Sequence, residues 1–417
     1  MPRVTDAQPD AVTTMFIARQ PIFDAKREVQ AYELLYRAAA TRHMEPIDGD
    51  VATARLIVDA FLTFGIDTLT GGRQAFVNFT RQALLDEFPT LLPSNRVVVE
   101  VLETVRLDAP VLAACRALKE AGYTLALDDV VGVDMRVRSM LGQADVIKVD
   151  FQQARPDDLA QAGLLASSRG VTLLAEKVET EEQFAHAVDL GFTRFQGYFF
   201  ARPHIVEGRD ILPSKLSYLR LMREVVRPDL DVDSLEKVLR GDLALTYKLL
   251  KYLNSAAFTW RHPITDLRHA IVAVGSRDLR KWVSLISLGQ MAADKPLELV
   301  VTSMARATFC EQLAELLGER SRGSDLFLTG LFSLLDAIMD RPQYECLADM
   351  NLPDDVNDAL LEEAGRFGQV LALTRAFEQS NWERVGDISD VLGVNCGNVA
   401  AAWRSAMHRA DCALIGN

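Results

Sequence analysis

The sequence predicts an α/β, TIM-like (β/α)₈ barrel followed by an all-helical half. Up to about residue 205, short apolar runs alternate with amphipathic helical stretches. The runs are apolar at nearly every position, as expected of strands that are covered on both faces. After residue 205, long amphipathic segments replace the β-branched runs, which indicates packed helices.

Six apolar runs are expected to form strands of the barrel. They are residues 75–78, 96–100, 124–129, 145–150, 172–176 and 194–197. Helix-like segments separate them, such as 109–121, where apolar residues recur at helical spacing. Because strand, helix and strand recur in this order, the strands should run parallel in one sheet.

The second half is expected to consist of amphipathic helices. Their predicted ranges are 214–226, 232–240, 244–254, 267–274, 279–291, 299–317, 325–339, 356–365, 371–379, 382–392 and 395–407. Residues 1–14 are polar and contain acids and prolines, so they predict a disordered tail. The expected domains are therefore the tail, a barrel at 15–205 and a helical domain at 206–417.

Composition narrows the class of partner. The 417 residues carry a formal net charge of −13, which argues against nucleic acid or an anionic membrane as the main partner. No uninterrupted apolar run approaches the ~18 residues of a membrane-spanning helix. The five cysteines are scattered, without metal-ligand or redox spacing. A cytoplasmic location is the expectation.

Acids and amides close several predicted strands at their C-terminal ends. They are Asn78, Glu100, Asp128, Asp129, Asp150, Glu176 and Gln196, with the earlier Glu33. Such ends meet at one face of a (β/α)₈ barrel, where active sites are built. Acids after strands can also cap helices, but the adjacent Asp128 and Asp129 repel each other unless a positive group lies beside them. The pattern predicts a site for a hard cation such as Mg²⁺ or Mn²⁺.

Lys148 is the one cation among these strand ends. It precedes Asp150 by two residues, so both point to the same side of a strand. It forms either a structural ion pair or a site that orients water or phosphate beside metal. The pattern leaves both open.

Taken in order, these segments resemble the EAL domain of bacterial cyclic di-GMP signalling. Eight segments resemble the family's motifs in the same order. They are Gln20–Pro21 (Q-P), Glu33–Arg37 (E-A-L-x-R), Phe76–Phe79 (the Asn strand), Glu100–Glu103 (E-x-x-E), Leu127–Asp129 (L-D-D), Lys148–Asp150 (K-x-D), Ala175–Thr180 (A-E-G-V-E-T) and Gln196–Tyr198 (Q-G-Y). The matches run through most of the first half.

The resemblance implies hydrolysis of cyclic di-GMP to pGpG with two Mg²⁺ or Mn²⁺ ions. The implied metal shell is Glu33, Asn78, Glu100, Asp128, Asp129, Glu176 and Gln196. Lys148 would place the attacking water, and Glu176 would also be the general base. Gln20 and Arg37 would contact the base and phosphate of the ligand. The implied supporting residues are Glu103, Asp150 and Glu179.

Two departures from the family concern the loops above the site. After L-D-D the family has F-G-x-G-Y-S-S, a loop that closes on the site and contacts the dimer partner, whereas residues 130–135 read V-V-G-V-D-M. The family's W-x-H-P segment is replaced by residues 38–45, and the stretch from Glu33 to Asn78 is shortened. Loss of a loop that aligns a site can cost orders of magnitude in rate.

The second half resembles an HDOD domain. The matching stretches are 241–256 and 264–275, and residues 330–336 (G-L-F-S-L-L-D) stand where related HD hydrolases carry G-L-L-H-D. The chain has no His-Asp dipeptide. This half is therefore expected to be a non-catalytic scaffold that binds protein partners, with Asp336 as a structural acid.

Two hypotheses about function stay open. The favoured one is a cyclic di-GMP sensor or scaffold, because the loop and the W-x-H-P segment diverge. The alternative is an active Mg²⁺- or Mn²⁺-dependent cyclic di-GMP phosphodiesterase, because the ligand set is nearly complete. A homodimer is among the expected assemblies, while the acidic balance disfavours nucleic-acid binding.

Overall fold

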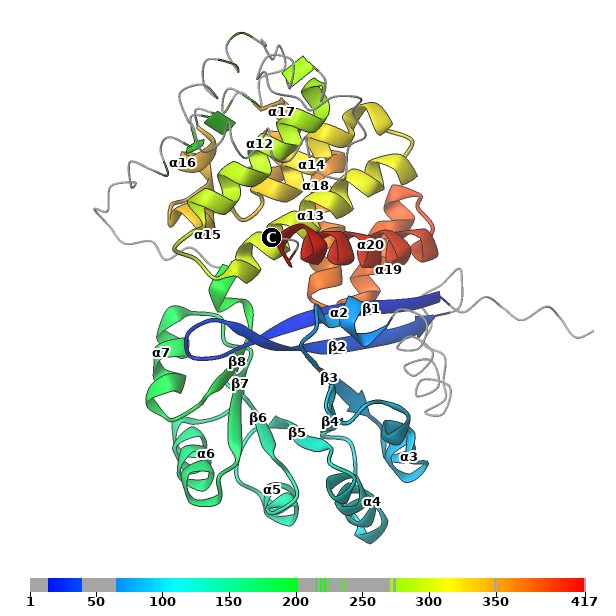
Figure 1. Ribbon diagram of the computed structural model, residues 1–417, viewed down its shortest axis with the longest axis vertical. Helices are drawn as coiled ribbons and strands as arrows, with labels where there is room; N and C mark the ends of the chain where they lie inside the picture. Colours follow the sequence, from blue (N-terminus) through cyan, green and yellow to red (C-terminus); the bar gives the residue numbers. More distant parts are fainter. Residues whose placement is uncertain are drawn as a thin grey trace, which may run out of the picture. The chain divides into compact units, whose positions relative to one another are not determined.

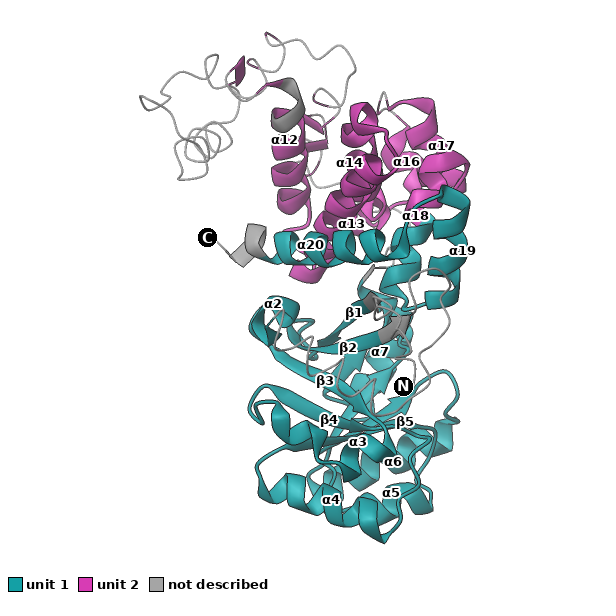
Figure 2. Cartoon of the chain, turned by 90° about the vertical axis from the view of Figure 1, so that its right-hand side faces the viewer, with its two compact units in different colours: residues 1–202, 372–417 teal, residues 203–371 magenta. Residues whose placement is uncertain are grey.

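The computed structural model describes residues 14–39, 65–201, 275–348, 350 and 352–415, with single helical positions between 215 and 272. Contacts divide the chain into two compact units (Figure 2). The barrel unit comprises residues 1–202 and 372–417, and the helical unit comprises residues 203–371. Residues 1–13 of the predicted tail, residues 40–45 of the divergent segment 38–45 and the HDOD-like stretch 241–256 lie outside the described residues, whereas Thr14 begins the first strand.

Eight strands close into a barrel in sequence order (Figure 1). They are β1 (Thr14–Phe23), β2 (Val29–Ala39), β3 (Gln74–Phe79), β4 (Val97–Val101), β5 (Thr124–Val130), β6 (Val146–Asp150), β7 (Thr172–Glu176) and β8 (Arg194–Gln196). Each consecutive pair of strands from β2 to β8 is parallel. The predicted TIM-like barrel is confirmed, and each of the six predicted strands is present.

The first strand differs from the expected all-parallel order. β1 runs antiparallel to both β2 and β8, so the barrel is mixed. Only residues 24–28 separate β1 from β2, and a parallel pair would need a crossover of a dozen or more residues. Asp24 stabilises the hairpin turn by accepting hydrogen bonds from the N–H groups of Lys26 and Glu28.

Helices follow the strands on the outside of the barrel (Figure 1). They include α3 (Arg81–Leu85), α4 (Ala109–Glu120), α5 (Met135–Met140), α6 (Pro156–Arg169) and α7 (Glu181–Asp189). Side chains just after the strands cap several of them. Asp108 accepts a hydrogen bond from the N–H of Val111, and Thr180 forms a reciprocal capping box with Gln183. These caps set where each loop above the barrel ends.

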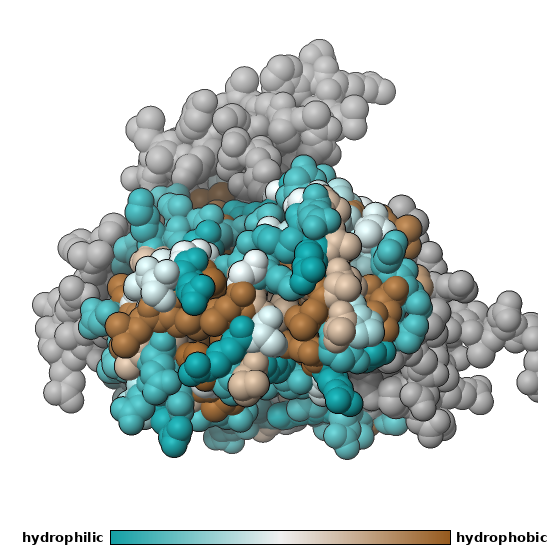
Figure 3. Space-filling view, turned by 90° about the horizontal axis from the view of Figure 1, so that it is seen from below, coloured by the Kyte–Doolittle hydropathy of each residue, from teal (hydrophilic) through white to brown (hydrophobic). Residues whose placement is uncertain are grey.

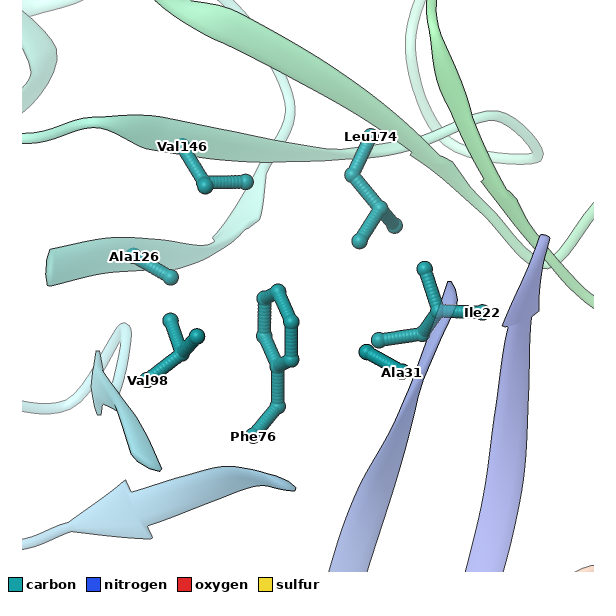
Figure 4. Packing of buried hydrophobic residues seen from close by; sticks show 7 residues of the cluster. All are labelled: Ile22, Ala31, Phe76, Val98, Ala126, Val146 and Leu174. Atoms are coloured by element: carbon teal, nitrogen blue, oxygen red, sulfur yellow. The ribbon is translucent and has the colours of Figure 1, made fainter. Parts of the chain in front are cut away.

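A layer of apolar side chains fills the barrel interior (Figure 4). It is formed by Ile22, Ala31, Phe76, Val98, Ala126, Val146 and Leu174, one from each of strands β1 to β7. Every one of these side chains is at least nine-tenths buried. The layer shows that the barrel is a packed core and not a pore, so a site can form only beyond it.

The described part of the helical unit consists of helices, as predicted. It contains α12 (Ser276–Met291), α13 (Leu297–Leu316), α14 (Gly323–Phe332), α15 (Leu335–Met339), α16 (Gln343–Leu347), α17 (Asp354–Glu362) and the start of α18 (Gly365–Glu378). A Cβ on Gly330 would lie 2.4 Å from the carbonyl oxygen of Arg306, so glycine lets α13 and α14 pack closely. Asp336 accepts a hydrogen bond from the N–H of Ala337. In the described part of the chain, no helix is long and apolar enough to span a membrane.

The C-terminal helices group with the barrel and not with the helical unit. They are α19 (Trp382–Leu392) and α20 (Cys396–Ile415) (Figure 2). The ring of Phe16 on β1 lies 6.2 Å from Phe377 and 5.8 Å from Trp382. Arg19 on the same strand forms an ion pair with Asp411 of α20. The contacts thus join the two ends of the chain in one compact unit, whereas the boundary at residue 205 remains a prediction about sequence domains.

Candidate active site

A polar layer lies next to the apolar layer, toward the C-terminal ends of the parallel strands. In each of β2 to β7, the polar residue follows the apolar one by two positions, so both point into the barrel. In the antiparallel β1, the polar residue precedes the apolar one by two. The polar layer consists of Gln20, Glu33, Asn78, Glu100, Asp128, Lys148, Glu176 and Gln196. The structure therefore brings most of the predicted site residues together.

These strand-end acids are not helix caps. The caps of α3, α4, α5 and α7 are Thr80, Asp108, Asp134 and Thr180. Each lies in the loop beyond the polar layer. The simpler explanation of the sequence pattern therefore does not account for Glu100, Asp128 and Glu176.

Lys148 occupies the centre of the polar layer. Its side chain is fully buried, and its Nζ lies 2.6 Å from Glu100, 2.7 Å from Asp128 and 2.9 Å from Glu176. A fourth carboxylate, that of Glu33, lies 3.4 Å away. These contacts are ion pairs between the ammonium and the carboxylates. One positive charge thus faces four carboxylates.

Two side-chain amides hold Glu33 from the other side. Asn78 donates from Nδ2 to Glu33 Oε1 at 3.1 Å, and Gln196 donates from Nε2 to Glu33 Oε2 at 2.6 Å. Gln196 Nε2 also donates to Gln20 Oε1 at 2.8 Å. Because the NH₂ groups of both amides face these acceptors, their carbonyl oxygens are available to bind another group.

Burial, together with the excess of acid, raises the pKa values of two carboxyl groups in the layer. Burial, followed by the charge of Glu33, raises the pKa of Glu100 well above its ordinary value. Burial also raises the pKa of Glu176 to about 7, although Lys148 opposes this. Burial lowers the pKa of Lys148, but the surrounding carboxylates outweigh it and raise that pKa well above the usual range. The lysine therefore stays charged, and the acids share a deficit of positive charge.

The polar layer forms the floor of a cavity of about 520 Å³. Its lining residues are Gln20, Glu33, Leu35, Asn78, Glu103, Asp128, Asp129, Gln152, Glu176, Lys177, Glu179, Gln196, Gly197, Tyr198 and Gln379. The fully buried Glu100 and Lys148 lie beneath this lining. Gln379, from the end of α18, shows that the C-terminal segment of the barrel unit contributes to the wall.

A second acidic group flanks the cavity around Lys177. The Lys177 Nζ lies 3.3 Å from Asp129 Oδ1 and forms an ion pair with the fully buried Asp150. Asp129 and Lys177 both have left-handed backbones, with φ of 46° and 55°. Burial raises the pKa of Asp150, but Lys177 and backbone N–H groups outweigh burial, so the net shift is downward.

The remaining predicted residues lie as follows. Glu103 and Glu179 line the cavity, and Glu179 accepts a hydrogen bond from Gln152. Arg37 is in β2, and its backbone lies opposite Phe16 of β1. The side chain of Arg37 is outside the described part of the structure. Beyond Asp129, Val131 in the loop and Met135 at the start of α5 are 39% and 81% exposed. Apolar patches also interrupt the hydrophilic surface of the face seen in Figure 3.

The cavity also contains residues that no sequence motif singled out, among them Lys177, Gln152 and Gln379. Lys177 carried a signal, because a charged residue occupies the position after Glu176 where the resembled motif has glycine. Gln379 carried none, since it lies far from the barrel in sequence.

The oxygen donors of the layer fit a hard divalent cation. Asn78 Oδ1, Gln196 Oε1 and Glu100 Oε2 are buried and accept no hydrogen bond from a described residue, a rare situation that a bound cation would resolve. Within the described residues, no group of three or more His, Cys, Asp or Glu side chains is already arranged to hold a metal. The acids instead face Lys148, so metal binding requires side-chain rotation.

Comparison with known families identifies both halves. Residues 13–203 match the EAL domain, and residues 212–339 match the HDOD domain. The cyclic di-GMP phosphodiesterase CdgJ of Vibrio cholerae is 37% identical over 96% of this chain and 94% of its own length. The uncharacterized protein YuxH of Bacillus subtilis is 33% identical over 91% of this chain and 94% of its own length.

A similar solved structure is that of BlrP1 from Klebsiella pneumoniae, in a complex with calcium and cyclic di-GMP. It is 22% identical, with a TM-score of 0.37, over 47% of this chain and 58% of that chain. The same protein has been solved in a complex with manganese and cyclic di-GMP.

Proposed function

The chain belongs to the family of proteins that join an EAL domain to an HDOD domain, and we propose that it is a divalent-metal-dependent phosphodiesterase of cyclic di-GMP. The observation that carries the proposal is the polar layer. Four carboxylates converge on Lys148 at the floor of a cavity, at the barrel end where active sites form.

The relatives support hydrolysis over sensing alone. CdgJ, which is named a cyclic di-GMP phosphodiesterase, aligns with nearly the whole chain. The enzymatic alternative is therefore favoured over the sensor hypothesis that the divergent loop suggested.

The proposed metal ligands are the oxygen donors of the cavity. They are Glu33, Asn78, Glu100, Asp128, Asp129, Glu176 and Gln196. When bound, two Mg²⁺ or Mn²⁺ ions would lower the pKa of a water between them and stabilise charge on the phosphoryl oxygens. The residues themselves hold the ions and offset their charge.

Lys148 and Glu176 would handle the attacking water. The Lys148 ammonium donates only, so it orients a water by its lone pair. Glu176 would accept the proton of that water as general base, because its carboxylate lies at the cavity floor, 2.9 Å from the Lys148 ammonium. Gln20 and Arg37 would contact the nucleotide. Glu103, Asp150 and Glu179 would support the ligands.

The helical half would bind a protein partner and carry no metal chemistry. Ser333 stands where HD hydrolases have histidine, and it donates a hydrogen bond to Gly330 and accepts one from Arg306. It is thus occupied in helix packing. A homodimer is the proposed assembly of the barrel, with the exposed Val131 and Met135 at the divergent loop.

A cyclic di-GMP sensor is the second candidate function. The observation that favours it is the loop after Asp129, which lacks the glycine hinge and the serines of the resembled lid. A sensor would bind the nucleotide without cleaving it.

One experiment separates the two functions. Purified full-length protein is incubated with cyclic di-GMP and Mn²⁺, and pGpG is measured by chromatography, with Glu176→Gln as the control. Turnover that the substitution abolishes supports the phosphodiesterase. Saturable binding without turnover, measured with Ca²⁺, supports the sensor. Absence of both turnover and nucleotide binding contradicts both functions and leaves binding to protein partners as the remaining function.

A further inference from the structure

Lys177 projects from a backbone that favours glycine. It follows Glu176 at the end of β7, and its φ of 55° lies in the left-handed region. Residues other than glycine are disfavoured in that region. Asp129, at the end of β5, has a φ of 46°. Two residues with left-handed backbones, near the ends of β5 and β7, therefore lie close together beside the cavity.

Their side chains form an ion pair. The Lys177 Nζ lies 3.3 Å from Asp129 Oδ1 and also contacts Asp150. Among the residues that line the cavity, Lys177 is the only Lys, Arg or His. Its side chain is 47% exposed, so it can leave this position by rotating its flexible stem.

The adjacent aspartates are thus neutralised by different lysines. Asp128 contacts the buried Lys148 at 2.7 Å, and Asp129 contacts the half-exposed Lys177. Lys148 is fully buried among four carboxylates, whereas Lys177 contacts Asp129 and Asp150 with a side chain that is 47% exposed. Asp150 also accepts hydrogen bonds from the backbone N–H groups of Gln152 and Gln153, so it keeps two partners when Lys177 moves away.

We infer that the Lys177 ammonium is an internal counter-ion that competes with a divalent cation for Asp129. The inference rests on the proposed metal site and concerns how tightly its second position fills. A cation that uses Asp129 has to displace the ammonium, and the displaced positive charge stays within the same cavity. Both effects would weaken the binding of a cation that uses Asp129.

Mn²⁺ binding to the full chain tests this inference. Free Mn²⁺ is measured by electron paramagnetic resonance during titration, for the wild type, Lys177→Met and Lys177→Gly. Lys177→Met removes the charge and keeps a side chain at the strained backbone, while Lys177→Gly removes both. We expect two binding steps in the wild type and a weaker step that tightens about tenfold or more in both variants.

Lys119→Met is the matched control. Lys119, on α4 of the same unit, pairs at 2.5 Å with Asp145, which directly precedes β6. Neither residue is in the cavity lining. Lys119→Met should change neither step. Lys177→Arg keeps the charge and should leave the weaker step weak.

The outcomes separate this inference from the proposed function. An unchanged weaker step in Lys177→Met overturns the inference even if the enzyme is active. A tightened step without pGpG formation supports the inference and contradicts the phosphodiesterase. Absence of Mn²⁺ binding in every variant overturns both.

Discussion

Two cations in the described part of the barrel unit, Arg19 and Lys148, have largely buried side chains but different surroundings. Arg19 on β1 pairs with Asp411, with Nη1 and Nη2 lying 2.5 and 2.7 Å from the two oxygens of that carboxylate. It also donates to the carbonyl of Leu69 and lies over the ring of Tyr32. Lys148 meets four carboxylates.

The difference separates a structural charge from a functional one. The Arg19 pair is matched in charge and shape, as a bidentate contact that joins distant parts of the chain. The Lys148 cluster has more acid than cation and leaves buried acceptors without donors. An arrangement that is poorly satisfied by itself is the expected form of a site that receives an external cation.

Removing the proposed general base should have the largest effect. Glu176→Gln keeps the size of the side chain but cannot accept the proton of the attacking water. We expect kcat for pGpG formation to fall by at least about 10²-fold. Near-wild-type turnover in this variant would exclude Glu176 as the base.

Breaking the matched pair should cost stability and not chemistry. Arg19→Met leaves the Asp411 carboxylate buried without its partner, so the free energy of unfolding should fall by about 3 kcal/mol. Denaturant unfolding of the full chain measures this. The double variant Arg19→Met/Asp411→Leu should recover much of the loss, since replacing both charges removes the unpaired acid. A double variant as unstable as the single one would contradict a simple ion pair.

Lys148→Met tests the mismatched cluster. It leaves four carboxylates without a buried cation, so the metal-free protein should lose stability. Saturating Mn²⁺ should then raise its melting temperature by several degrees more than in the wild type, because binding stabilises the folded state by mass action. Equal Mn²⁺-induced shifts in the two proteins would show that the cluster does not receive the ion.

The pH dependence of the metal-free protein should show a gradual effect that needs no substitution. Burial raises the folded pKa of Glu176 from 4.5 to about 7, so between these values the folded state binds more protons than the unfolded state. Stability should therefore fall as pH rises from about 4.5 to 7, by at most ~1.4 kcal/mol per pH unit for this group. Glu176→Gln should flatten the fall. Asp150 acts oppositely but in a lower range, because its pKa is lowered from 3.8.

Much of the candidate site could be predicted from sequence. Strands alternate their side chains with a period of two, and parallel strands end at one face, so Glu100, Asp128 and Glu176 could be placed together from their positions in apolar runs. The hairpin of β1 and β2 was harder, because its strands lack the uninterrupted apolar pattern of the others.

The sequence by itself determined the barrel, the helical half and the acids at the strand ends, because these depend on local periodicity. Tertiary structure alone decided which charges meet. It placed Lys148 among four carboxylates, set Lys177 against Asp129 and brought α20 to β1 through Asp411. Such pairings join residues far apart in the chain, and no local pattern encodes them. The physical distinction between a balanced ion pair and an acid-rich site exists only once the chain has folded.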